Sequence, residues 1–184
     1  MRVIGGELRS RLLKSVPGDA TRPTPDRLRE SLFNILQVRL QGATFLDAYA
    51  GTGAVGIEAL SRGAAHATFL EKDRVAADTI RENLASLQLE HRGTVVKGAV
   101  LKTLALWPAQ IVFLDPPYAL ESEYTGALEL LAESPPELTV VQHSVRLELA
   151  EAYGNLSRTR LLKQGDNALS FYRTSREREG AEDL

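Results

Sequence analysis

The sequence predicts an α/β domain in which a mostly parallel sheet carries helices on both faces. Short apolar runs typical of buried strands alternate with segments of helical periodicity along most of the chain, which indicates repeated β-α-β units. One run, Ile111 to Leu114, is apolar at every position and ends abruptly at Asp115, as a buried strand of such a sheet does. With 184 residues, 43% of them apolar, the chain is expected to form one domain around one core.

The chain is expected to begin with a basic arm over residues 1–24. Residues 1–16 alternate apolar pairs with glycines and basic residues, which favours a small β-hairpin, and the prolines within 17–25 indicate an irregular linker. A first helix is predicted next, with Thr24 as its N-cap and Pro25 as its first residue. Leu28, Leu32 and Leu36 lie on its apolar stripe.

The main domain is expected to span residues 25–173. Parallel strands are predicted at 44–46, 67–70, 94–96, 111–114 and 138–141. Helices are predicted at 55–62, 73–89, 101–106, 124–132 and 145–152. An antiparallel pair at 156–163 and 168–173 closes the sheet, which then has seven strands. Residues 174–184 are charged and lack apolar spacing, so we expect a disordered tail.

Composition restricts the function further. The net charge is −2, yet residues 1–39 hold eight basic and four acidic residues, which favours a nucleic-acid partner for the arm; a merely solvated surface is the alternative. The chain has no Cys, and its three His show no metal spacing, so we expect neither disulfides nor a metal. Because no apolar run is long enough for a membrane span and no leader region is visible, we expect a cytoplasmic protein without membrane contact.

Residues Asp115, Pro116, Pro117 and Tyr118 are the first candidate for chemistry. Ligands of parallel sheets bind beyond the carboxyl ends of the strands, where this segment lies. The two prolines restrict the backbone, so that the carboxylate and the aromatic ring are held in place. A fixed acceptor beside an aromatic face suits a planar nitrogenous group that must lose a proton. An ordinary strand end with a half-buried tyrosine is the alternative.

A glycine-rich loop over residues 47–56 is the second candidate. Gly51, Gly53 and Gly56 fit the pattern G-x-G-x-x-G, and Glu71 ends the next strand, where an acid would accept hydrogen bonds from a ribose hydroxyl pair. Asp47 would repel a pyrophosphate but attract the ammonium or sulfonium of S-adenosylmethionine. The alternative is that the glycines serve only close helix packing. The candidate cofactor residues here are Asp47, Tyr49, Gly51, Gly53, Glu71 and Lys72, the last against adenine.

Taken together, these segments resemble the bacterial RsmD-type family of 16S rRNA guanine-N2 methyltransferases. The resemblance covers residues 2–173 and is carried by residues 2–6, 22–24, 29–36, 47–63, 115–118 and 168–172. It implies a Rossmann-like S-adenosylmethionine-dependent methyltransferase fold. It also implies that backbone groups near Gly98 and Ala99 hold adenine, because no acid follows the third strand as is usual in the family.

The resemblance implies a mechanism and a substrate. Asp115 and the Pro116 carbonyl would accept hydrogen bonds from the exocyclic amine of a guanine, while Tyr118 stacks on the base. The partner would be 16S rRNA or an assembling small ribosomal subunit. The candidate RNA-binding residues are Arg2, Arg9, Arg11, Lys14, Arg22 and Thr24.

Other functions remain open at this point. The same chemistry could act on DNA adenine or cytosine, or on a protein amide. A non-catalytic RNA-binding factor would keep the pocket without the reaction, and a nicotinamide-dependent oxidoreductase would use the glycine loop for a dinucleotide. Asp47 and the Asp-Pro-Pro-Tyr segment disfavour the oxidoreductase.

Overall fold

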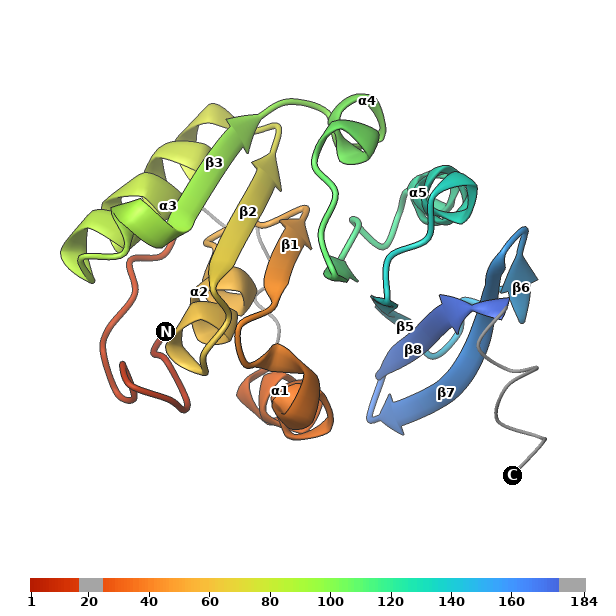
Figure 1. Cartoon of the computed structure of the whole chain (residues 1–184), viewed down its shortest axis with the longest axis horizontal. Coiled ribbons are helices and arrows are strands. Elements are labelled where there is room, and N and C mark those ends of the chain that lie inside the picture. The colour runs from red at the N-terminus through yellow and green to blue at the C-terminus, as the bar shows by residue number, and fades with distance from the viewer. Residues whose placement is uncertain (17–24, 176–184) are drawn as a thin grey trace.

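The computed structural model describes residues 1–16 and 25–175, and it confirms an α/β fold (Figure 1). The α-helices are α1 (Asp26–Leu40), α2 (Ala54–Ser61), α3 (Arg74–Ser86), α4 (Val100–Thr103) and α5 (Glu121–Glu133). The strands are β1 (Thr44–Ala48), β2 (His66–Glu71), β3 (Gly93–Lys97), β4 (Ile111–Leu114), β5 (Leu138–Ser144), β6 (Ala152–Tyr153), β7 (Leu156–Gln164) and β8 (Asn167–Thr174). Short 3-10 turns follow α3 at Glu90–Arg92 and α4 at Leu104–Leu106.

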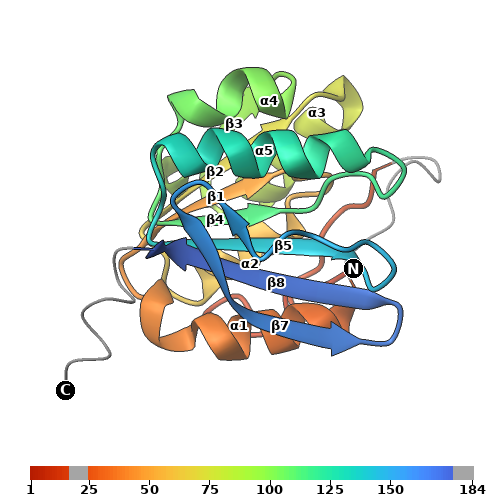
Figure 2. The ribbon, with the colours of Figure 1, turned by 90° about the vertical axis from the view of Figure 1, so that its right-hand side faces the viewer.

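The sheet has eight strands in the order β3-β2-β1-β4-β5-β8-β7-β6, so the prediction of seven was wrong by one. The first five run parallel, and β8, β7 and β6 complete the sheet with antiparallel pairing. Figure 2 shows α5 on one face of the sheet and α1 on the other. Two clusters of buried hydrophobic residues match this arrangement. One packs the sheet against α1, α2 and α3, and the other packs it against α4 and α5.

The prediction of a helix over 145–152 was wrong: residues 145–151 are turns and irregular chain, and the additional strand β6 begins at Ala152. Residues 145–151 do not form a helix because several of their backbone groups form hydrogen bonds with residues distant in the sequence. The Val145 amide donates to the Asp166 carbonyl, and the Leu149 carbonyl accepts from the Arg158 guanidinium. The local composition favours a helix, but these contacts with the β7–β8 hairpin override it.

Helix boundaries follow the predicted capping only in part. Asp73 caps α3 as expected, since its carboxylate accepts from the Ala76 amide at 2.9 Å. In α1, Pro25 occupies the N-cap position and not the first helical position, and no side chain caps that end. Thr24, the expected cap, lies outside the described residues.

Side-chain alternation places the sheet residues that matter for function. Phe45, Phe69 and Phe113 belong to the buried cluster on the α1–α3 face, whereas Leu46, Leu70 and Leu114 belong to the cluster on the opposite face. Residues two positions apart along a strand point to the same side. Asp47, Glu71 and Asp115 each follow one of these phenylalanines by two positions, so all three acids project from the α1–α3 face at the carboxyl edge.

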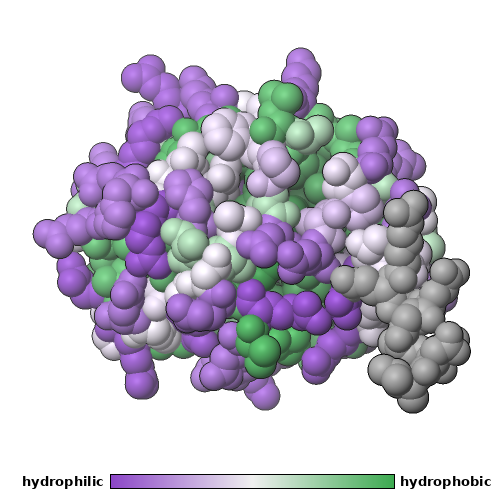
Figure 3. Space-filling view, in the orientation of Figure 1, coloured by the Kyte–Doolittle hydropathy of each residue, from purple (hydrophilic) through white to green (hydrophobic). Residues whose placement is uncertain are grey.

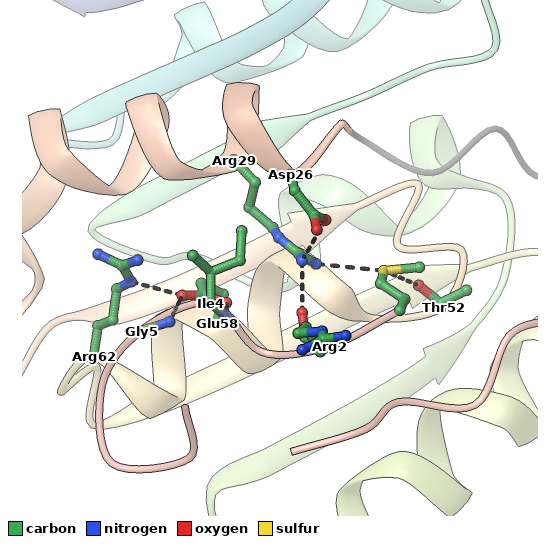
Figure 4. A network of polar contacts seen from close by, with 9 residues as sticks. Arg2, Ile4, Gly5, Asp26, Arg29, Thr52, Glu58 and Arg62 are labelled. Atoms are coloured by element: carbon green, nitrogen blue, oxygen red, sulfur yellow. Dashed lines mark hydrogen bonds and ion pairs between the residues drawn. The ribbon is translucent and has the colours of Figure 1, made fainter. Parts of the chain in front are cut away.

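The N-terminal segment folds back on itself as the predicted small hairpin and packs against the domain. Around the antiparallel bridge between Arg2 and Leu12, the Val3 amide donates to the Arg11 carbonyl and the Leu13 amide to the Met1 carbonyl, both at 3.0 Å. Val3 and Leu13 are buried in the cluster of the α1–α3 face. The buried Glu58 carboxylate of α2 accepts hydrogen bonds of 2.8 Å from the amides of Ile4 and Gly5 (Figure 4).

A second anchor comes from α1. Arg29 is fully buried, and its guanidinium donates to the Arg2 carbonyl at 2.7 Å and to the Asp26 carboxylate at 3.1 Å (Figure 4). Burial lowers the pKa of Arg29, while the field of Glu58 raises it. The two anchors join the first residues of the chain to α1 and α2 and fix their path.

The C-terminal strand passes the expected domain boundary at residue 173. β8 ends at Thr174, and the Ser175 amide donates to the Asn155 carbonyl at 2.8 Å. The expected disorder of the tail from 176 onward falls outside the described residues. Figure 3 shows a face that is mainly hydrophilic, with hydrophobic residues surfacing in small separate groups. Among the described residues, no helix combines the length and the apolar character that crossing a bilayer requires.

Replacing Glu58 by Ala should destabilise the fold by about 3 kcal/mol or more, because it leaves Arg62 without its 2.7 Å ion pair and two buried amides without acceptors. Urea denaturation measures the change. The matched control is Glu129→Ala on the exposed side of α5, which should change stability by less than about 0.5 kcal/mol. Equal stability of the two variants would contradict the anchoring role of Glu58.

Candidate active site

Three carboxylates from adjacent strands meet at the carboxyl edge of the sheet. β1 lies between β2 and β4, and Asp47 is in register with Phe69 on one side and Phe113 on the other. Asp47 and Glu71 are 2% and 9% exposed, and Asp115 is half-buried. Burial raises the pKa of Asp47 most, and the negative charges of Asp115 and Glu71 raise it further, as expected for carboxylates at the ends of neighbouring strands.

Asp47 is turned toward the start of α2. Its Oδ2 accepts a hydrogen bond of 2.8 Å from the Gly56 amide, so the carboxylate holds the loop between β1 and α2. Burial raises the pKa of Asp47 well above its ordinary value, and this hydrogen bond opposes the shift only in part. The sequence led us to expect an acid that faces a ligand directly; in the structure, Asp47 first of all organises the glycine loop.

Glu71 organises the same loop from the next strand. Its Oε2 accepts from the Gly51 amide and its Oε1 from the Asp73 amide, both at 2.8 Å. A carboxylate has about four acceptor sites, so each oxygen can accept one further hydrogen bond. Glu71 therefore combines a fixed position with free acceptor capacity.

The glycine loop contains a sharply turned backbone. Tyr49, Gly51 and Gly53 all have positive φ, at 64°, 56° and 77°. For Tyr49 this conformation is unusual, and its hydroxyl donates a 2.6 Å hydrogen bond to Glu123 of α5, which holds the ring. Burial and the neighbouring Glu123 carboxylate raise the pKa of this phenol.

Gly56 has a packing role. A Cβ atom there would lie 2.3 Å from the Phe69 ring, so only glycine lets α2 approach β2 this closely. Among the glycines of the G-x-G-x-x-G pattern, Gly56 therefore supports the alternative interpretation, in which a glycine serves close packing of the helix. Gly51 and Gly53 form the turn itself.

The Asp115–Tyr118 segment is tied down on two sides. The Pro116 carbonyl accepts a hydrogen bond of 2.9 Å from the hydroxyl of Tyr124, a fully buried residue of α5. The Tyr118 hydroxyl donates to Oδ1 of Asn167 at 2.6 Å, at the start of β8. Pro117 is exposed, and Asp115 and Tyr118 are half-buried. The segment is thus held by one helix and one strand while its two functional groups remain accessible.

Glu123, Tyr124 and Asn167 support the site but were not predicted from the sequence. Glu123 and Tyr124 are consecutive residues of α5, and each holds one of the two loops. Asn167 precedes the segment 168–172 that carries part of the family resemblance, yet no sequence pattern connects it with Tyr118, 49 positions away.

The remaining cofactor candidates lie beside Glu71. Gly98 follows β3, and its amide donates to the Glu71 carbonyl at 3.0 Å. Ala99 is exposed at the N-cap of α4, and Lys72 is exposed beyond the end of β2. All three therefore border the same edge of the sheet.

The basic residues of the arm are not gathered at this edge. Arg2 and Arg9 are exposed, and Arg11 donates to the Ser86 carbonyl at the end of α3 farthest from Glu71. Lys14 pairs with Glu82 of α3 at 2.9 Å. Arg22 and Thr24 lie outside the described residues. Within those residues no cluster of His, Asp or Glu is arranged to hold a metal ion.

Replacing Asp47 by Asn should increase stability relative to the wild type, and increasingly so as the pH rises above 3.8, the ordinary pKa of an aspartate. Because the folded-state pKa is raised, the native state binds more protons than the unfolded chain in that window, so the wild type loses stability there with rising pH. The Asn variant has no such proton uptake and keeps an oxygen to accept from Gly56. Denaturant titrations from about pH 4 upward, the side on which a raised pKa lowers stability, measure this difference.

The control for this series is Asp78→Asn, which makes the same change at an exposed carboxylate of α3, where solvent screens the charge and its ion pair with Arg81. If the stability difference between Asp47→Asn and the wild type does not change with pH, or shrinks as the pH rises, then ionisation of the buried Asp47 carboxylate does not lower stability.

Comparison with known proteins places the chain. A family model described as "Conserved hypothetical protein 95" matches residues 1–173. YlbH of Bacillus subtilis (strain 168), named as a candidate rRNA methyltransferase, is 36% identical over 94% of this chain and 98% of its own length. Ribosomal RNA small subunit methyltransferase D of Escherichia coli (strain K12) is 44% identical over 64% of this chain and 60% of its own length.

Solved structures agree with this placement. The yhhF protein of Escherichia coli, described as a candidate methyltransferase, superposes with a TM-score of 0.80 at 36% identity, covering 95% of this chain and 97% of that one. A hypothetical protein of Thermus thermophilus gives a TM-score of 0.77 at 33% identity, covering 93% of this chain and 98% of that one. Since the family model spans residues 1–173 and relatives at 36% identity cover nearly the whole chain, the chain belongs to the RsmD-type methyltransferase family.

Proposed function

We propose that this protein transfers a methyl group from S-adenosylmethionine to the exocyclic N2 amine of a guanine in 16S rRNA. The observation that carries the proposal is the row of Glu71, Asp47 and Asp115 on one face of three adjacent strands, with Tyr118 beside the last. The relatives named as rRNA methyltransferases support the reaction class and the substrate. The guanine N2 amine follows from the family resemblance.

The residues present fit the cofactor. Glu71 has acceptor capacity left for a pair of ribose hydroxyls, and the backbone at Gly51 and Gly53 carries no side chain that would block a close approach. Burial, and then the negative charges of Asp115 and Glu71, raise the pKa of Asp47, and a ligand that carries an ammonium and a sulfonium would relieve this repulsion between the carboxylates. When bound, S-adenosylmethionine supplies an electrophilic methyl group on positively charged sulfur.

Asp115 and Pro116 receive the amine. The lone pair of a guanine N2 is delocalised into the ring, so the nitrogen needs acceptors for its two protons as it attacks. The Asp115 carboxylate accepts one N–H, and the Pro116 carbonyl, whose direction Tyr124 fixes, has a second lone pair for the other. The nitrogen gains positive charge as the N–C bond forms, Asp115 stabilises that charge, and one amine proton then passes to Asp115 or to water.

Tyr118 provides the stacking surface. A base must leave its own stack to reach Asp115, and stacking on an aromatic side chain offsets about 1–3 kcal/mol of the cost. The ring is half-exposed and lies in the same loop as Asp115, which suits a flipped base whose amine points to the carboxylate. No metal has a part in this scheme.

The substrate is an assembling small ribosomal subunit in the cytoplasm. The described cations of the N-terminal segment are few and dispersed, with Arg11 and Lys14 against α3 and Arg2 and Arg9 exposed elsewhere, so they suit contacts with a folded particle better than tight binding of free RNA. Tritium transfer from labelled cofactor to small subunits, free 16S rRNA and DNA, followed by nucleoside analysis, tests this assignment. Label in N6-methyladenine, or transfer to DNA alone, would contradict it.

Replacing Asp115 by Asn should lower kcat for methyl transfer by about 100-fold or more, because the developing charge on nitrogen loses its carboxylate. Binding of S-adenosylhomocysteine, measured by calorimetry, should stay close to wild type, since Glu71 and the glycine loop are unchanged. Asp78→Asn serves as the control for a surface carboxylate. A fully active Asp115→Asn enzyme would remove Asp115 from the mechanism.

A further inference from the structure

The ring of Tyr118 is tethered at its far end. Its hydroxyl reaches Oδ1 of Asn167 at 2.6 Å, a short hydrogen bond in which the tyrosine donates and the amide oxygen accepts. The backbone of Tyr118 is restrained through Pro116 and Pro117. With its hydroxyl bound as well, the ring is held at both ends of its long axis.

Asn167 is itself a rigid point. It is the first residue of β8 and is 8% exposed. Its backbone is paired with Ser144 of β5 on one side and with Gln164 of β7 on the other. The preceding residue is bound too, since the Asp166 carbonyl accepts from the Val145 amide. The acceptor of the tether therefore lies on the sheet and not on a loose loop.

The strand register places this tether on the face of the three acids. Leu169 and Phe171 of β8 belong to the same buried cluster as Phe113, and Asn167 precedes Leu169 by two positions. Asn167 thus projects from the face that carries Asp115. The Tyr118 ring itself packs against the buried cluster of the α4–α5 face, so its bond to Asn167 joins the segment after β4 to β8 at the carboxyl edge of the sheet.

We propose that Asn167 is a positioning residue for methyl transfer, which holds the Tyr118 ring in the orientation on which the substrate base stacks. The inference rests on the proposed function. A free tyrosine ring would lose rotamer freedom each time a base stacked on it, whereas the tethered ring loses this freedom once, during folding. The tether also fixes the distance between the stacked base and Asp115, to which in-line attack is sensitive.

A double-mutant cycle tests the proposal. The variants are Asn167→Ala, Tyr118→Phe and the pair of both, assayed on small subunits reconstituted with transcribed, unmethylated 16S rRNA. Each single change removes the same hydrogen bond, so each should raise KM for the RNA substrate by about 2- to 12-fold, the value of one net hydrogen bond. The double variant should show no more than the larger single effect. KM for the cofactor should not change.

Two further variants make the result specific. Tyr118→Leu removes the ring as well as the hydroxyl, so it should raise KM for RNA more than Tyr118→Phe does. Asn155→Ala is the matched control, because Asn155 also bonds from the antiparallel half of the sheet, but to the Ala132 carbonyl at the end of α5. This control should leave KM for RNA unchanged.

The outcomes separate the inference from the proposed function. A wild-type protein that transfers no methyl group to the particle would refute the proposed function. An active wild type with Asn167→Ala and Tyr118→Phe at wild-type KM would overturn the tether, as would single effects that multiply in the double variant. If Asn167→Ala does not fold, as judged by S-adenosylhomocysteine binding, Tyr118→Phe tests the same bond from the loop side.

Discussion

Three neighbouring strands each carry a phenylalanine in the core and, two residues later, a carboxylate at the sheet edge: Phe45 with Asp47, Phe69 with Glu71, and Phe113 with Asp115. The same alternation that buries the rings brings like charges together, which is unfavourable for folding. Backbone amides of the glycine loop and of Asp73 offset part of this cost by donating to Asp47 and Glu71. In the proposed function the remaining repulsion is offset when a cationic methyl donor binds, so the fold gives up stability at the proposed site.

The two loops of the site depend on supports that lie outside it. Consecutive residues of α5 hold both: Glu123 binds Tyr49 of the glycine loop, and Tyr124 binds the Pro116 carbonyl of the Asp-Pro-Pro-Tyr segment. Because consecutive residues of α5 hold both loops, the packing of α5 on the sheet restrains both parts of the proposed site.

The N-terminal segment shows how charge and packing can be combined. Its composition indicated a separate basic arm, and its described cations are indeed exposed or paired at the surface. Its backbone, however, is fastened by the buried Glu58 and Arg29, and Val3 and Leu13 fill the core. The segment is therefore part of the domain's packing while it presents positive charge to the outside.

The sequence by itself determined seven of the eight strands, most helices, the acids that end the strands and the Asp-Pro-Pro-Tyr segment, because these depend on residues close together in the chain. Only the tertiary structure decided the rest. The register between strands brought the three carboxylates to one face of the sheet. Contacts with β7 and with the β7–β8 turn prevented residues 145–152 from forming a helix. The hydrogen bond between Tyr118 and Asn167 joins residues that are 49 positions apart. Such pairings leave no local pattern, since the energy that selects them appears only when distant segments pack together.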